Sequence, residues 1–316
     1  MEKDVSFRIR QIIGPPGTPG TTRIQTRMSL DGGGARTAAL TGAALAGFAA
    51  NSILCRWALG LRQIDAASFT GIRLLSGALA LVILAGAARP PAKVAGGWVS
   101  AAALFAYAGA FSFAYLQLGA GFGALILFGT VQATMIGWGI VRGRRPGLLE
   151  WAGLAVALAG LTVLSLPGFT APDPAGAGLM TLAGIAWGVY SLRGRGSADP
   201  LGDTAGNFAR SLPFGIALVL ATTTTAHVTL QGVLIAVVSG AVTSGVCYSF
   251  WYAALRRLTA TTAAIVQLTV PLMAALGGVA LIGESISMRL AIASALILGG
   301  VALALGGRAP GPLRNN

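Results

Sequence analysis

Charged side chains are scarce in this sequence. Of its 316 residues, 10% are Asp, Glu, Lys or Arg, whereas soluble globular proteins carry about 25%. Hydrophobic residues make up 55% of the chain, and the mean hydropathy is +0.76. Such a composition excludes an ordinary soluble domain, because most of the chain has to be shielded from water.

Residues that carry metal or redox chemistry are almost absent. The two cysteines, Cys55 and Cys247, lie inside apolar segments, and the single histidine, His227, lies near an expected loop. A disulfide framework, a metal site and a resident cofactor are therefore not expected. A membrane-embedded enzyme would need metal ligands or a nucleophile paired with a base, and the sequence supplies neither set. We therefore expect no enzyme.

Acidic residues are missing from the middle of every apolar segment. A proton relay through a buried carboxylate has no carrier here, since arginine does not lose its proton at useful pH. A small multidrug exporter for cationic drugs would also need an acid at this depth. This absence predicts facilitated diffusion or weakly coupled antiport rather than a strong proton-driven pump.

Ten segments are apolar and long enough to span a bilayer, which takes about 20 residues. They are residues 37–59, 66–88, 97–118, 121–142, 148–167, 176–194, 204–226, 230–255, 259–283 and 286–307. The sequence therefore predicts an all-α integral membrane protein with ten transmembrane helices.

The net charge of +13 comes from arginines placed between the apolar segments. This placement sets topology and does not suggest nucleic-acid binding. With both termini in the cytoplasm, 17 Lys and Arg residues lie on the inner side and two on the outer side. Residues 1–36 and 308–316 are then cytoplasmic tails, the first of them expected to be disordered. An alternative is that the natural chain starts at Met28.

The two halves of the chain match when they are offset by 137 residues. Arg73 aligns with Arg210 in this register, and the Ser112-Phe113 pair aligns with Ser249-Phe250. The repeat spans residues 37–167 and 176–307 and holds five helices, so the second copy enters the membrane from the opposite side. Inverted repeats of this kind favour alternating access around a site near the membrane midplane.

Several stretches resemble the EamA family of the drug/metabolite transporter superfamily. They are residues 49–59, 64–77, 186–191 and 269–284, and the resemblance covers roughly residues 40–307. It implies a bacterial inner-membrane protein, with several family members exporting amino acids or related metabolites. One departure is Gly143-Arg144, at the position where the family often has a Gly-Glu pair.

Arg73 and Arg210 are the ionisable residues deepest in the apolar segments, about 10 Å from opposite faces at a rise of 1.5 Å per residue. One hypothesis is that they attract an anionic group or hold two gates. The other is that each side chain reaches its nearer interface.

Other polar and aromatic residues are expected to line a central cavity with these arginines. They are Asn51, Ser52, Tyr115, Gln132, Trp187, Tyr190, Tyr248, Tyr252 and Gln267. Interfacial anchoring of Trp and Tyr, or hydrogen bonds between helices, would explain the same residues.

These observations predict a secondary transporter, and an exporter, of small metabolites such as amino acids. Its partners would be the substrate and the lipid bilayer, without nucleic acid, and the oligomeric state is left open. The alternative is a membrane-embedded scaffold or sensor without transport activity.

Overall fold

The computed structural model describes residues 21–118, 120–143, 147–165, 173–282 and 288–306. Both expected tails, up to residue 20 and from residue 307, and the Gly283-Glu284 pair lie outside this part. Within it the chain is helical, apart from one isolated β-bridge between Ile64 and Val228. The prediction of an all-α protein is confirmed.

The first half of the chain forms five long helices. They are α2 (Thr21–Gly60), α3 (Ala66–Ala87), α4 (Trp98–Gln117), α5 (Ala120–Val141) and α6 (Leu148–Ser165). The second half forms α7 (Pro174–Gly194), α8 (Pro200–Ala221), α9 (Leu230–Val238), α10 (Cys247–Leu255), α11 (Ala260–Gln267), α12 (Thr269–Ile282) and α13 (Met288–Gly306). A short 3-10 turn, η1 (Thr223–Thr225), follows α8, and a π-helical segment, η2 (Ser239–Val246), joins α9 to α10.

Five helical stretches among the described residues are long and apolar enough to cross a membrane. They are Gly34–Gly60, Ala66–Ala87, Trp98–Gln117, Pro174–Gly194 and Leu230–Leu255. Further apolar helical stretches are shorter by this measure. The chain is thus a multi-pass membrane protein, while ten crossings and the position of the termini stay predictions.

Aspartates begin three of the helices. Asp65, Asp173 and Asp199 each accept a hydrogen bond from the backbone N–H three residues later, at 2.8–3.0 Å. Pro174 and Pro200 follow the last two at the first helical position, where a missing N–H costs nothing. The carboxylates therefore mark helix ends, which explains their absence from the apolar interiors.

Two elements differ from the sequence expectation. Helix α2 starts at Thr21 rather than at residue 37, because elongating a helix is far easier than nucleating one. The segment expected as one helix over 259–283 is interrupted at Leu268. Pro271 has no N–H to give to the carbonyl of Gln267 four residues earlier, and its ring crowds that carbonyl.

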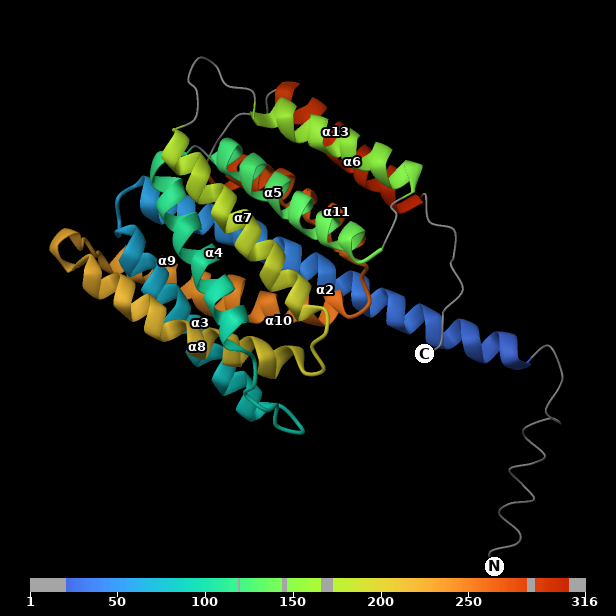
Figure 1. Ribbon diagram of the computed structural model, residues 1–316, viewed down its shortest axis with the longest axis horizontal. Coiled ribbons are helices and arrows are strands. Elements are labelled where there is room, and N and C mark those ends of the chain that lie inside the picture. Colours follow the sequence, from blue (N-terminus) through green and yellow to red (C-terminus); the bar gives the residue numbers. More distant parts are fainter. Residues whose placement is uncertain (1–20, 119, 144–146, 166–172, 283–287, 307–316) are drawn as a thin grey trace, which may run out of the picture.

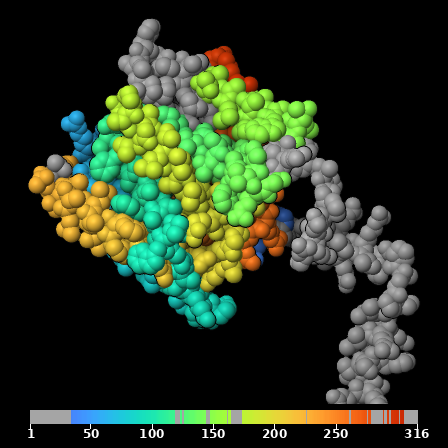
Figure 2. Space-filling model, in the orientation of Figure 1, coloured from blue at the N-terminus to red at the C-terminus, as the bar shows by residue number. Residues whose placement is uncertain are grey.

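Helices α6 and α13 pair along one side of the bundle (Figure 1). A Cβ on Gly153 would lie 2.5 Å from the carbonyl oxygen of Gly300, so these two glycines allow the backbones to touch. On the opposite part of the bundle, α4 packs against both α7 and α8, and the three share the face seen in Figure 2. The buried interior that carries the candidate site lies among α2, α3, α4, α7 and α10.

Candidate functional site

Arg73 is buried in the middle of the bundle, with 1% of its surface exposed. Its Nε donates to the Ser244 hydroxyl at 2.8 Å, and one Nη nitrogen donates to the Tyr248 hydroxyl at 2.7 Å. The same nitrogen lies 3.5 Å from the Tyr107 hydroxyl, and Tyr248 also donates to Tyr107 at 3.3 Å. We call these four residues the Arg73 centre. It joins α3 and α4 of the first half to η2 and α10 of the second.

Aromatic rings enclose the Arg73 centre. The guanidinium carbon lies 5.3 Å from the ring centroid of Tyr107 and 5.7 Å from that of Phe111, within the range of a cation–π interaction. Trp187 packs against both tyrosine rings, at centroid distances of 4.9 Å to Tyr107 and 4.6 Å to Tyr248. The guanidinium is therefore held by ring faces and hydroxyls rather than by a carboxylate.

The positive charge of Arg73 is not neutralised within the described part of the chain. No Asp or Glu there forms an ion pair with it, and its other Nη nitrogen is buried without a hydrogen-bond partner. An ion buried without a counter-ion costs several kcal/mol in a folded protein. Hydroxyl dipoles and aromatic faces offset only part of this cost, so the centre would be stabilised by a bound anion.

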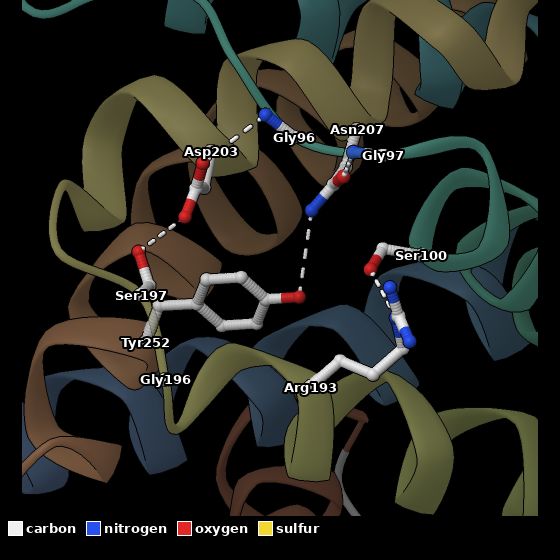
Figure 3. A pocket seen from close by; sticks show the side chains of 9 residues that line it. All are labelled: Gly96, Gly97, Ser100, Arg193, Gly196, Ser197, Asp203, Asn207 and Tyr252. Atoms are coloured by element: carbon white, nitrogen blue, oxygen red, sulfur yellow. Dashed lines mark hydrogen bonds between the residues drawn. The ribbon is translucent and has the colours of Figure 1, made fainter.

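A polar pocket of about 340 Å³ opens at the end of the bundle where α7 stops and α8 starts. The pocket, called here the end pocket, is shown in Figure 3. Its lining residues are Gly96, Gly97, Ser100, Arg193, Gly196, Ser197, Asp203, Asn207 and Tyr252. Asp203 and Asn207 accept hydrogen bonds from the backbone N–H groups of Gly96 and Gly97, at 3.1 and 2.9 Å. These bonds fix the loop before α4 onto α8.

Gly96 is required in this loop. Its φ is +73°, a left-handed conformation that other residues rarely adopt. A Cβ on Gly96 would also lie 2.5 Å from the Asn207 side-chain oxygen. The pocket wall is therefore set by backbone as much as by side chains.

Two tyrosines separate the end pocket from the Arg73 centre. Tyr252 lines the pocket and stacks on Tyr190, with ring centroids 4.8 Å apart. The Tyr190 ring lies 6.3 Å from that of Tyr248, which binds Arg73. The Tyr190 hydroxyl is buried without a hydrogen-bond partner, although Tyr252 donates to its backbone carbonyl at 3.2 Å. A thin aromatic layer thus divides a polar pocket from a buried cation.

At the opposite end, two loops are held together by what we call the clasp, residues 63–65 and 227–229. The β-bridge between Ile64 and Val228 lies at its centre. The Asp65 N–H donates to the His227 carbonyl at 2.8 Å, and the Thr229 N–H donates to the Gln63 carbonyl at 2.9 Å. The loops that precede α3 and α9 are therefore joined at this end of the bundle.

The Asp65 carboxylate takes part in the clasp. It accepts hydrogen bonds from the backbone N–H groups of Ser68 at 2.8 Å and His227 at 3.1 Å. Partial burial opposes its ionisation, but these hydrogen bonds outweigh that effect and lower the pKa of Asp65 below its ordinary value. Asp65 is thus a carboxylate at neutral pH.

The structure brings several of the predicted site residues together around Arg73. Trp187, Tyr190 and Tyr248 pack on one another, and Gln267 joins them because its side-chain oxygen accepts a 2.6 Å hydrogen bond from the Trp187 indole. Tyr252 lies one layer further out, at the end pocket.

Arg210 does not share the environment of Arg73. It is partly exposed near the end pocket, and one Nη nitrogen donates to the carbonyls of Ala95 and Gly206. Arg210 is therefore closer to the surface than Arg73, and its position relative to the membrane interface stays a prediction.

The remaining predicted residues bond helix to helix or within a helix. The Asn51 side-chain oxygen accepts from Ser239 at 2.6 Å, and the buried Gln132 amide donates to the Ala264 carbonyl. Ser52 bonds the Phe48 carbonyl one turn earlier at 3.2 Å, and the Tyr115 ring packs edge-on against Phe111. For these four residues the structure shows contacts within the bundle; a role in substrate binding stays a prediction.

The sequence reasoning missed Tyr107 and Ser244 at the centre and Arg193, Asp203 and Asn207 at the pocket. Asp203, Asn207 and Arg210 recur at helical spacing along α8 and could have indicated a polar face. Ser244 gave no such signal, because the π-helical turn changes the phase that normal helical spacing predicts.

Comparison with known proteins agrees with this geometry. Residues 174–306 match the model of the EamA-like transporter family. The uncharacterized protein PA1977 of Pseudomonas aeruginosa is 52% identical over 274 residues, which are 86% of this chain and 96% of that protein. A crystal structure of another protein shares the fold, with a TM-score of 0.67 at 22% identity, over 84% of this chain and 98% of the other.

The chain belongs to the EamA-like transporter family. It is therefore a membrane protein of the drug/metabolite transporter superfamily, as the resemblance in the sequence implied. The family consists of transporters rather than enzymes. In this EamA-like transporter the Arg73 centre and the end pocket are the candidate parts that handle a substrate.

Proposed function

We propose that this protein is a secondary transporter that exports a small metabolite with an anionic group, such as an amino acid, by alternating access. Arg73 attracts the anionic group, and the surrounding rings pack against the apolar part of the substrate. The protein resides in the bacterial inner membrane.

The observation that carries this proposal is the buried, unneutralised charge of Arg73 at the contact between the two halves of the chain. A charge buried inside a membrane bundle marks a substrate or ion pathway more often than a structural support. The free Nη nitrogen gives a carboxylate a hydrogen-bond donor as well as a charge. Substrate binding between the halves fits a mechanism in which they rock against each other.

The charge of the loops supports an orientation for the two ends of the bundle. Lys93, Arg193 and Arg195 lie next to the end pocket, and basic loops stay in the cytoplasm. The end pocket then faces the cytoplasm and the clasp faces the other side of the membrane. An end pocket that is open on the cytoplasmic side is consistent with the proposal of export.

Counterflow in proteoliposomes tests this function. Purified protein is reconstituted with unlabelled amino acids or small organic acids inside, and uptake of the labelled compounds is followed. We expect uptake that depends on the internal compound. Absence of counterflow from folded protein, across wider substrate pools, would favour the scaffold or sensor alternative.

The two arginines provide a matched pair of variants. Arg73→Gln should lower the exchange rate at low substrate concentration by at least tenfold, since a hydrogen bond to a charged group contributes about 1.5–3 kcal/mol. Arg210→Gln removes the same charge near the surface and should change exchange by less than about threefold. Equal effects of the two variants would contradict the assignment of Arg73.

A further inference from the structure

The end pocket contains one acidic and one basic side chain that do not pair with each other. Asp203 and Arg193 lie on opposite sides of it, with Asn207 and the Tyr252 ring between them (Figure 3). No ion pair joins Asp203 or Arg193 to another residue within the described part of the chain. Because the two opposite charges line one pocket without pairing, each remains available to bind a ligand group of opposite charge.

Arg193 is bound through only part of its guanidinium. Its Nε donates to the Ser100 hydroxyl at 2.8 Å, which directs the group along the pocket wall. Among the described residues no hydrogen bond or ion pair engages its two Nη nitrogens, and the residue is exposed. A guanidinium held in this way can offer its remaining donors to a carboxylate.

Asp203 is held by neutral donors. Its two carboxylate oxygens accept from the Gly96 N–H at 3.1 Å and from the Ser197 hydroxyl at 2.6 Å. A carboxylate has about four acceptor positions, of which these bonds use two. The remainder can accept from an ammonium group.

The surface between the two charges is neutral and polar. The Asn207 amide nitrogen donates to the Tyr252 hydroxyl at 3.4 Å, and both side chains are at most 2% exposed. A pocket of about 340 Å³ has the size of those that bind small molecules, about 300–1,000 Å³. It can hold a compact solute against this surface.

We propose that the end pocket is a recognition site for small zwitterions, which carry a carboxylate and an ammonium group a few bonds apart. Arg193 binds the carboxylate and Asp203 binds the ammonium group. A simple carboxylate would be repelled by Asp203, and a simple amine by Arg193. Tyr252 forms the floor of the pocket, so a zwitterion held there is next to the aromatic layer that covers the Arg73 centre. This inference rests on the proposed transport function and narrows its substrate class.

Counterflow with three sets of labelled compounds tests the inference. The first set is neutral L-amino acids, the second their N-acetyl derivatives, which lack the ammonium group, and the third the corresponding amides, which lack the carboxylate. We expect the wild-type protein to exchange the amino acids at least about tenfold faster than either derivative at equal low concentration. This comparison needs no variant, so it stands even where a substitution impairs folding.

Substitutions then assign the two charges. Asp203→Asn should reduce the preference for amino acids over N-acetyl derivatives about tenfold, and Arg193→Gln should reduce the preference over the amides by a similar factor. Arg256→Gln is the matched control, because it removes a charge that is exposed and bonds only the Ala198 carbonyl in the described structure. It should alter neither preference.

Each result decides the question. Exchange of N-acetyl derivatives as fast as that of amino acids would overturn the zwitterion site and leave the transport function standing. Retained preferences in well-folded Asp203→Asn and Arg193→Gln proteins would overturn it as well. No exchange of any of the three sets, with other metabolites exchanged, would also leave transport intact and exclude this ligand class. No exchange of any compound would overturn both proposals.

Discussion

At the scale of single residues, the two arginines show how strongly burial changes the interactions that a side chain makes. Arg73 and Arg210 lie at similar depths in their predicted segments, so the sequence alone predicts the same role for both. In the folded protein Arg73 is 1% exposed and bonds tyrosine and serine hydroxyls, whereas Arg210 bonds backbone carbonyls near the end pocket. Burial deprives Arg73 of water, so each hydroxyl that contacts it matters more.

Tyr248→Phe is therefore expected to weaken substrate exchange more than Tyr107→Phe. The Tyr248 hydroxyl lies 2.7 Å from an Arg73 nitrogen, while that of Tyr107 lies at 3.5 Å, beyond the usual range of a strong hydrogen bond. We expect the apparent KM for counterflow to rise about tenfold for Tyr248→Phe, in line with the roughly 1.5 kcal/mol contributed by a hydrogen bond to a charged group, and about twofold for Tyr107→Phe. The reverse order would show that the Arg73 centre is held mainly by Tyr107.

At this scale the sequence predicts which polar and aromatic residues belong to the site. It does not predict which of them contact each other. The sequence predicts Trp187, Tyr190 and Tyr248 among the polar and aromatic residues of one site, and they do lie together. Tyr107 carries the same chemistry but has only apolar residues around it in the sequence. Its role depends on α4 packing beside α3 and α10, and no local pattern encodes that contact.

At the scale of elements, the loops at the two ends of the bundle are fastened differently. The clasp joins residues 63–65 to 227–229 by backbone hydrogen bonds and one β-bridge. At the other end, Asp203 and Asn207 hold the Gly96 and Gly97 backbone and leave a pocket beside them. Alternating access requires that the clasp open during each cycle.

A disulfide across the clasp should stop transport. In Gln63→Cys/Thr229→Cys the new thiols replace two residues that face each other across the antiparallel bridge and are linked by a 2.9 Å backbone hydrogen bond. Cα atoms of such pairs lie about 4.5–5.5 Å apart, which is within the range of a disulfide. We expect oxidation to reduce counterflow at least tenfold and a reducing agent to restore it. Each single-cysteine variant serves as the control, and both should keep their activity after oxidation. Unchanged transport through the oxidised double variant would show that the clasp does not need to open.

The clasp should also loosen at acid pH and at no other pH. The pKa of Asp65 is lower in the folded protein than in the unfolded chain. The stability that its carboxylate gives to the clasp is therefore fully present above the unfolded pKa of about 3.9, and it is lost as the pH falls through the folded pKa. Hydrogen exchange of the His227 amide, corrected for its intrinsic rate, should be unchanged from pH 8 to pH 5 and accelerate only below about 4. The Asp65→Asn protein should lack this acid step. A transition near neutral pH would assign the pH dependence to another group.

At the scale of the whole molecule, hydropathy predicts an all-α membrane protein, because length and apolarity decide whether a segment can cross a bilayer. The all-α class is confirmed, and ten crossings stay a prediction. The interruption at Leu268 follows from Pro271. The early start of α2 at Thr21 was not foreseen, since the glycines at 32–34 indicate the end of a helix in a soluble context. How the helices pack was beyond the sequence, because nearly every face is apolar.

The orientation of the bundle is a prediction that two small residues can test. Ala198 lies in the loop beside the end pocket, Ala226 lies next to the clasp, and both are exposed. In intact cells a membrane-impermeant maleimide should label Ala226→Cys and should label Ala198→Cys only after permeabilisation. The native Cys55 and Cys247 are buried and should contribute little background. The opposite pattern would reverse the predicted orientation of the bundle.

The π-helical segment η2 has a consequence for how the Arg73 centre can be lost. It lies directly before α10, and it places Ser244 beside Arg73 while the following turn presents Tyr248 to the same group. Each residue of an α-helix turns the chain by about 100°. Deleting one residue from this wide turn would convert it to ordinary α-helical winding and change which side chains of η2, Ser244 among them, face Arg73. The Arg73 centre therefore depends on the number of residues in η2 as well as on their types. Loss of a single codon from η2 would disrupt the centre even though the codons for all four of its residues remain.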